Sequence, residues 1–127
     1  LPDKYLNTKG IEFPYGEKIV LNEKNCNHEV YWIRVTLKRK NISGEGGKNI
    51  HLDIHSTLND TTSIYYVSVR VKEMPVEITE EWITSEYTLS AFNRYHCGNT
   101  IGVYFYNPEL EEMLIDDMKI EIYGVKQ

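Results

Sequence analysis

The chain has 127 residues and a mass of 14.9 kDa, which is the size of one domain and enough to bury a core without disulfide staples. It is 41% hydrophobic and 26% charged, with a mean hydropathy of −0.46. This composition excludes the disordered, collagen-like and membrane-inserted classes of protein. Fourteen Lys and Arg against nineteen Asp and Glu give a net charge of −5, so we expect no nucleic-acid partner.

Short runs rich in Val, Ile, Thr and Tyr, separated by Gly, Pro, Asn and Asp, predict antiparallel strands. In chain order we expect about eight, near residues 11–13, 17–22, 29–39, 48–55, 63–72, 82–90, 100–106 and 113–123. Residues 76–81 fit either a helical turn or a loop. Because no repeat or charge block divides the sequence, we expect a single domain over residues 1–127.

Alternation along the strands separates a core face from an outer face, since neighbouring strand residues point to opposite sides of a sheet. With no helix to cover them, such one-sided strands must bury their apolar faces against each other. This predicts an all-β fold, either a two-sheet antiparallel sandwich or a barrel. The inward residues are Tyr31, Ile33, Val35, Leu37, Ile50, Leu52, Ile54, Tyr65, Val67, Val69, Val71, Ile101, Val103, Phe105, Met118, Ile120 and Ile122.

The same alternation gives Asp116 an inward direction, on the face of Met118 and Ile120. A carboxylate that points at a core is costly unless it is hydrogen-bonded or binds a cation. Ca²⁺ with oxygen ligands at the rim of a sandwich would compensate. The alternative, which remains open, is that Asp116 accepts backbone N–H groups where the strand begins.

The C-terminal part of the chain resembles the last two strands of jelly-roll carbohydrate-binding modules and galactose-binding-like domains. The resemblance rests on the runs Val103–Glu109 and Leu114–Tyr123, the second of which contains Ile-Asp-Asp-Met. Upstream, Tyr65-Tyr66, Glu81-Trp82 and Tyr87-Thr-Leu89 have the order and spacing seen in such modules, so the resemblance covers about residues 60–123. It implies a jelly-roll sandwich.

The resemblance also implies a structural Ca²⁺ site, because one of the two aspartates on the last strand often binds calcium in this superfamily. Carried over to this sequence, the implied ligand is Asp116, with Asp117 as the second choice and Glu12 as a partner near the first strand.

In modules of this kind, aromatic rings stack on sugar rings while polar side chains bind the hydroxyl groups. Aromatic residues make up 12% of this chain, and several have the outward direction. If their strands share one sheet, they form a platform for a glycan; the alternative is that they stabilise the sheet as cross-strand pairs or pack against a neighbouring domain. The candidate ligand-binding residues are Trp32, Arg34, His51, Asp53, Tyr66, Arg70, Tyr104 and Tyr106, with His55 beside them.

The run His51-Leu-Asp53-Ile-His55, with the distant His96, is similar to the two-His-one-carboxylate triad of jelly-roll Fe(II) oxygenases. However, two residues four positions apart on a strand are about 13 Å apart, so both histidines cannot bind one ion. We therefore favour a solvated polar face for this run.

Two cysteines leave three alternatives open. Cys26 with His28 and His96 with Cys97 supply two sulfur and two nitrogen ligands for zinc, although their spacing matches no familiar zinc module. The two thiols could instead form a disulfide or remain free.

No phosphate-binding glycine loop or nucleophile elbow occurs in the sequence, so we expect no enzyme. The chain starts at Leu1 without Met or an apolar leader, which suggests a piece of a longer protein. We expect a non-catalytic carbohydrate-binding module of a secreted or cell-surface protein, with the periplasm as another location. The alternative is a structural or interaction sandwich without a sugar ligand. The expected partners are a carbohydrate or a neighbouring domain of the parent protein, with no membrane insertion.

Overall fold

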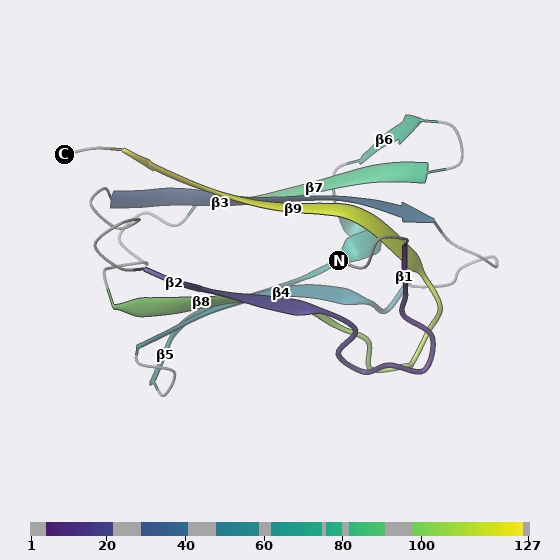
Figure 1. The fold of residues 1–127 in the computed structure, drawn as a ribbon, viewed down its shortest axis with the longest axis horizontal. Helices are drawn as coiled ribbons and strands as arrows, with labels where there is room; N and C mark the ends of the chain where they lie inside the picture. Colours follow the sequence, from purple (N-terminus) through teal and green to yellow (C-terminus); the bar gives the residue numbers. More distant parts are fainter. Residues whose placement is uncertain are drawn as a thin grey trace.

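A computed structural model describes residues 5–21, 29–40, 48–58, 62–74, 76–79, 82–90 and 98–125 of the chain. These residues form two antiparallel sheets that lie one above the other (Figure 1). The five-stranded sheet has the order β1 (Leu6–Asn7), β9 (Leu114–Val125), β3 (Glu29–Lys40), β7 (Trp82–Ser90) and β6 (Val76–Thr79). The four-stranded sheet has the order β2 (Gly16–Val20), β8 (Asn99–Tyr106), β4 (His51–Leu58) and β5 (Thr62–Arg70).

The order of the strands is that of a jelly roll with one added strand. When β6 is set aside, each sheet contains four strands, and the chain crosses repeatedly from one sheet to the other. β1, β3, β7 and β9 make one sheet, and β2, β4, β5 and β8 make the other. The all-β, two-sheet antiparallel sandwich predicted from the sequence is therefore confirmed.

Two segments differ from the prediction. Residues 11–13 are not a strand, because the first strand is Leu6–Asn7 and the chain then runs as an irregular loop. Residues 76–79 are neither a helical turn nor a loop, because they pair with β7 as an edge strand after the short 3-10 helix Val71–Glu73. The described part of the chain thus has nine strands instead of eight.

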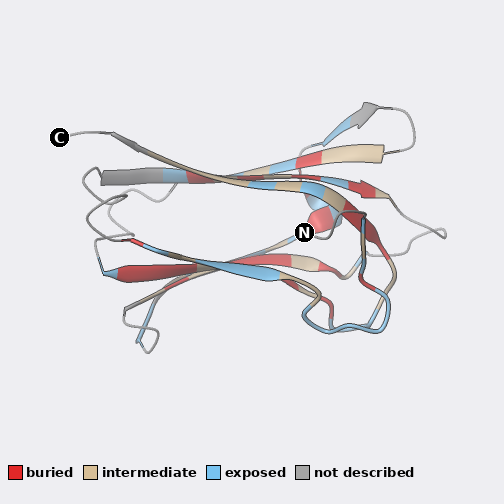
Figure 2. Ribbon diagram, in the orientation of Figure 1, coloured by how far each residue is buried: buried red, intermediate tan, exposed pale blue. Residues whose placement is uncertain are grey.

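The core lies between the two sheets, and buried residues recur along the strands of both layers (Figure 2). The predicted inward residues of β3, β4 and β8 whose side chains the structure describes are fully buried, and the Tyr31 side chain lies outside the described part. The predicted inward residues of β5 and of the second half of β9 are partly buried and pack against this core. The fully buried set from the three central strands is Ile33, Val35, Leu37, Leu52, Ile54, Ile101, Val103 and Phe105.

A β-bulge in β9 reverses the predicted direction of Asp116. In the register with β3, Thr36 pairs with Lys119 and Lys38 pairs with Asp116, so two residues of β9 lie opposite Leu37 alone. Asp117, at the bulge, has the left-handed φ of 49°, which Asp tolerates better than most residues. Asp116 therefore shares the outer face with Lys38, and the expectation that its carboxylate points at the core is wrong.

Candidate functional site

The outer face of the four-stranded sheet brings together most of the predicted ligand-binding residues. On this face, β4 lies between β8 and β5, so each outer residue of β4 has an outer neighbour on either side. Asp53 occupies the middle of the arrangement. The three neighbouring rows, read from β8 to β5, are Tyr106, His51 and Arg70; Tyr104, Asp53 and Ser68; and Gly102, His55 and Tyr66.

Trp32 and Arg34 do not belong to this face, because β3 lies in the five-stranded sheet. There, the Trp32 ring contacts Tyr123 edge-on, with 6.3 Å between ring centroids, and the Arg34 guanidinium lies 5.0 Å from the centroid of the Tyr123 ring. The condition for a shared platform is therefore met by Tyr66, Tyr104 and Tyr106, and not by Trp32.

A recess of about 220 Å³ opens on the outer face of the four-stranded sheet, and we call it the aromatic recess. The Phe13 ring, 57% exposed, stacks on Tyr106 with centroids 5.3 Å apart and planes at 22°, and lies 6.2 Å from the Tyr104 ring. The loop before β2 thus adds a ring to those of the sheet. The aromatic recess is lined by Glu12, Phe13, Asp53, Tyr66, Tyr104 and Tyr106.

Asp53 is only 2% exposed although its side chain has the outward direction. Its Oδ2 accepts a hydrogen bond of 2.9 Å from the Tyr66 hydroxyl. Its Oδ1 is buried and has no hydrogen-bond partner among the described residues. Because a buried carboxylate oxygen without a donor is costly, the aromatic recess contains an acceptor suited to a ligand that donates a hydrogen bond.

The tyrosines around Asp53 keep their protons tightly. Burial, helped by the hydrogen bond to Asp53, raises the pKa of Tyr66 above its ordinary value. Burial and the negative charge of Asp53 also raise the pKa of Tyr104. Both side chains are therefore neutral hydroxyl donors at neutral pH, and the field around them is negative.

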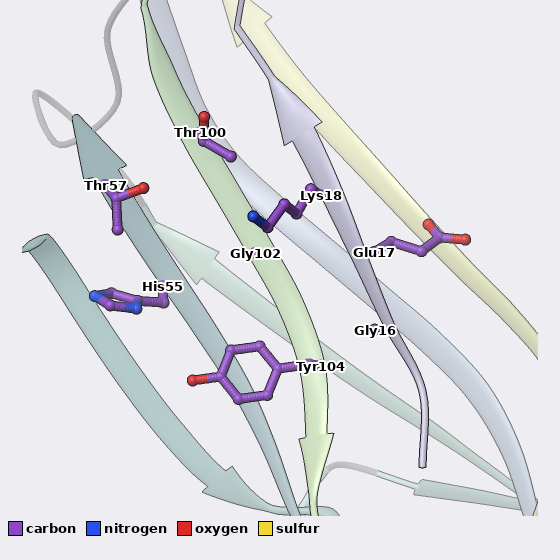
Figure 3. A pocket seen from close by; sticks show the side chains of 8 residues that line it. All are labelled: Gly16, Glu17, Lys18, His55, Thr57, Thr100, Gly102 and Tyr104. Atoms are coloured by element: carbon purple, nitrogen blue, oxygen red, sulfur yellow. The ribbon is translucent and has the colours of Figure 1, made fainter. Parts of the chain in front are cut away.

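A second recess, of about 420 Å³, adjoins the first on the same face, and we call it the glycine-floored recess. Its floor is Gly102, at an outward-facing position of β8. Because glycine has no side chain, the space between β2 and β4 is not filled there. Tyr104 lines both recesses. Figure 3 shows the side chains of Lys18, His55, Thr57, Thr100 and Tyr104 around this bare position.

Gly16 lets β2 approach Tyr104 closely. A Cβ added at this position would lie 2.8 Å from Tyr104 Cβ, which is shorter than a normal contact. The glycine therefore fixes the place of Tyr104 between the two recesses.

The loop that carries Glu12 and Phe13 is held by the buried side chain of Asn107. Asn107 Nδ2 donates to the carbonyl oxygens of Thr8 and Glu111, at 3.0 and 2.9 Å, and its Oδ1 accepts from the Glu111 N–H at 2.9 Å. The Asn107 N–H also donates to the Glu12 carbonyl oxygen at 2.7 Å. This network connects the loop to the end of β8 and so positions the Phe13 ring.

Three residues of the site were missed by sequence reasoning. Phe13 was assigned to a strand, and nothing local indicates that its loop folds over β8. Asn107 was treated as part of a turn between strands. Gly102 did carry a signal, because a glycine inside a strand often marks a place where a ligand or another backbone comes close.

The structure does not bring the three predicted calcium ligands together. Glu12 lines the aromatic recess, whereas Asp116 and Asp117 lie on β9 in the other sheet. Asp116 Oδ1 accepts a hydrogen bond of 2.9 Å from the Asp117 N–H, and Asp117 Oδ2 is 3.2 Å from Lys38 Nζ. Among the described residues, no three His, Cys, Asp or Glu side chains are grouped to hold a metal ion.

The remaining predicted sites lie partly beyond the described ranges. Cys26, His28, His96 and Cys97 are outside the described residues, so the zinc, disulfide and free-thiol alternatives stay predictions. No helix in the described part of the chain is both long and apolar enough to cross a membrane.

No family model and no curated protein sequence matches the chain. Among solved structures, a sugar-binding protein described as the EclA C-terminal domain matches with a TM-score of 0.38 and 14% identity, over 93% of this chain and 77% of that chain. A likeness at this level does not identify the ligand of the present chain.

Proposed function

We propose that this protein binds carbohydrate on the outer face of the four-stranded sheet, with the aromatic recess as the centre of the site. The observation that carries the proposal is the buried Asp53 carboxylate, whose Oδ1 has no donor among the described residues, in a recess that the rings of Phe13, Tyr66, Tyr104 and Tyr106 also line.

The chemistry of a sugar ring matches this arrangement. A pyranose has flat patches of C–H groups, which pack against aromatic rings, and a rim of hydroxyl groups, which donate hydrogen bonds. A hydroxyl donated to Asp53 Oδ1 would be a charge-assisted bond, stronger than one between neutral groups. The exposed ring of Phe13 supplies an aromatic surface for stacking, next to that carboxylate.

The glycine-floored recess supports a ligand longer than one sugar. It shares the Tyr104 wall with the aromatic recess and offers the hydroxyls of Thr57 and Thr100 to a second sugar unit. The ligand would then lie along β8, with Tyr104 between its two units.

The proposal is tested with a glycan-array screen followed by calorimetric titration of the saccharides that bind. Tyr104→Ala, which removes an aromatic ring, and Asp53→Asn, which removes the carboxylate charge, should each weaken binding about tenfold or more. Trp32→Ala is the matched control, since it removes an exposed ring, 46% exposed, from the opposite sheet. Thermal melts of all three variants check that they remain folded.

Two results would overturn the proposal. One is the absence of binding to any saccharide at millimolar concentration, which would favour an interaction or spacer domain. The other is an equal loss of affinity in Trp32→Ala and Tyr104→Ala, which would place the ligand elsewhere.

A further inference from the structure

The charges that line the aromatic recess are all of one sign. Glu12 and Asp53 contribute two carboxylates, and the other described lining residues are aromatic. No described Lys or Arg side chain lines this recess. A recess of this composition disfavours a ligand with a carboxylate or sulfate group, because the anion would lose water and meet like charge.

The basic residues of the same face lie outside the aromatic recess. Arg70 is opposite His51, in the neighbouring row, and lies 3.8 Å from the Glu73 carboxylate. Lys18 is opposite Gly102 and lines the glycine-floored recess. Neither residue borders the aromatic recess, so the charge of Asp53 is not offset within it.

Asp53 adds an independent observation to the charge pattern. The residue is only 2% exposed, and its Oδ1 has no donor among the described residues. A ligand that brings both a hydrogen-bond donor and a positive charge would satisfy this oxygen better than a neutral hydroxyl. The surrounding ring faces also attract a cation.

We propose that the aromatic recess selects amino sugars in their ammonium form over the corresponding neutral N-acetylated sugars. The inference rests on the proposed carbohydrate-binding function and narrows its ligand class. The ammonium group donates to Asp53 Oδ1 and lies within the field of Glu12, while the sugar ring packs against Phe13 and Tyr104.

The test compares sugars that differ only in acetylation. Glucosamine and galactosamine are titrated beside N-acetylglucosamine and N-acetylgalactosamine at pH 7, where most molecules of an amine of this type carry a proton. Each amino sugar should bind about tenfold more tightly than its acetylated partner, since a hydrogen bond to a charged group replaces a weaker one. Monosaccharides are used because a polycation would attach to any acidic surface of a chain with net charge −5.

Two variants test whether the preference for amino sugars arises at the aromatic recess. Asp53→Asn keeps the shape of the side chain and its acceptor for Tyr66 but removes the charge, so the tenfold preference should fall to nearly equal binding. Glu86→Gln is the matched control, because it removes an exposed carboxylate from the five-stranded sheet and should leave the preference unchanged.

Three outcomes would overturn the inference, and only the third is also a failure of the proposed function. Equal or tighter binding of the acetylated sugars overturns the selectivity while carbohydrate binding stands. Equal binding of choline and glucosamine overturns the assignment to sugars, because a simple cation site would suffice. If no neutral or amino saccharide binds at all, the proposed function fails together with the inference.

Discussion

The outer faces of the two sheets both carry aromatic and charged side chains, but these side chains have different partners. On the five-stranded sheet, Arg34 lies over the Tyr123 ring, its Nε is 3.4 Å from Glu86 Oε1, and the Tyr123 hydroxyl donates to Glu121 at 2.6 Å. On the four-stranded sheet, the buried Asp53 carboxylate accepts a hydrogen bond from Tyr66 through one oxygen, and its other oxygen has no donor in the described structure.

An outward aromatic residue is therefore weak evidence for a binding site on its own. Trp32 and Tyr66 are almost equally exposed, at 46% and 50%. Each outer face has a buried polar atom without a hydrogen-bond partner among the described residues, the Arg34 Nε donor on the five-stranded sheet and the Asp53 Oδ1 acceptor on the four-stranded sheet. What separates their surroundings is that only the second of these atoms is an acceptor. The following variants test that difference, beginning with the largest expected effect.

Asn107→Ala should lower the free energy of unfolding by about 3 kcal/mol, because it removes three side-chain hydrogen bonds and leaves the Glu111 N–H without its acceptor. Ligand affinity should fall as well, since the loop with Phe13 loses its anchor. Urea unfolding measures the first effect and calorimetry the second. Asn7→Ala is the matched control, because its side-chain bond to Glu112 is exposed, and a loss as large as that of Asn107→Ala would contradict the account.

Gly16→Ala should cost about 2 kcal/mol, since its Cβ would lie 2.8 Å from Tyr104 Cβ and one strand must shift. Gly102→Ala should change stability by less than about 0.5 kcal/mol, because its Cβ would meet its nearest atom, the His55 carbonyl oxygen, at 3.7 Å. Chemical denaturation of both variants measures the difference. If Gly16→Ala were as stable as the natural protein, the close approach that places Tyr104 would be disproved.

The raised pKa of Tyr66 makes stability depend on pH in the alkaline range. The folded state holds this proton more tightly than the unfolded state, so the stabilisation is complete below the ordinary tyrosine pKa of about 10 and is lost as the pH rises further. Tyr66→Phe should therefore make the alkaline loss of stability shallower, as followed by thermal melts over a pH series. An unchanged pH dependence would contradict a raised pKa of Tyr66 in the folded protein.

Glu86→Gln should have little effect, since it removes only an ion pair whose side chains are 40% and 49% exposed. We expect a change in stability of less than about 1 kcal/mol, because exposed pairs are screened by water. Ligand affinity should stay the same. A loss of affinity in this variant would indicate that the five-stranded face takes part in binding.

The packing of the sandwich was predictable because it depends on a local period. Alternation along β3, β4 and β8 assigned Ile33, Leu52 and Val103 to the core, and all three are fully buried. The reversal at Asp116 was not predictable, because a bulge with a non-glycine residue in the left-handed region leaves no local signal. Strand β6 was missed because edge pairing with β7 decides its conformation.

The candidate site was predictable only in part. Alternation shows whether a side chain points inward or outward, but it does not show which of the two sheets its strand belongs to. Trp32 and Tyr104 both point outward, yet they lie on opposite layers, and only the order of strands reveals this. The burial of Asp53 likewise depends on Tyr66 and Tyr104, which reach it from neighbouring strands. Such contacts between strands that are distant in sequence cannot be seen in one strand at a time.

The most direct test of the account is an NMR titration of the isotope-labelled protein with the saccharide that binds most tightly. We predict that the amide signals of Asp53, Tyr66 and Tyr104 shift with a common dissociation constant while the Trp32 indole signal stays in place. Shifts centred on Trp32, with Asp53 and its neighbours unchanged, would contradict the assignment of the ligand to the four-stranded face.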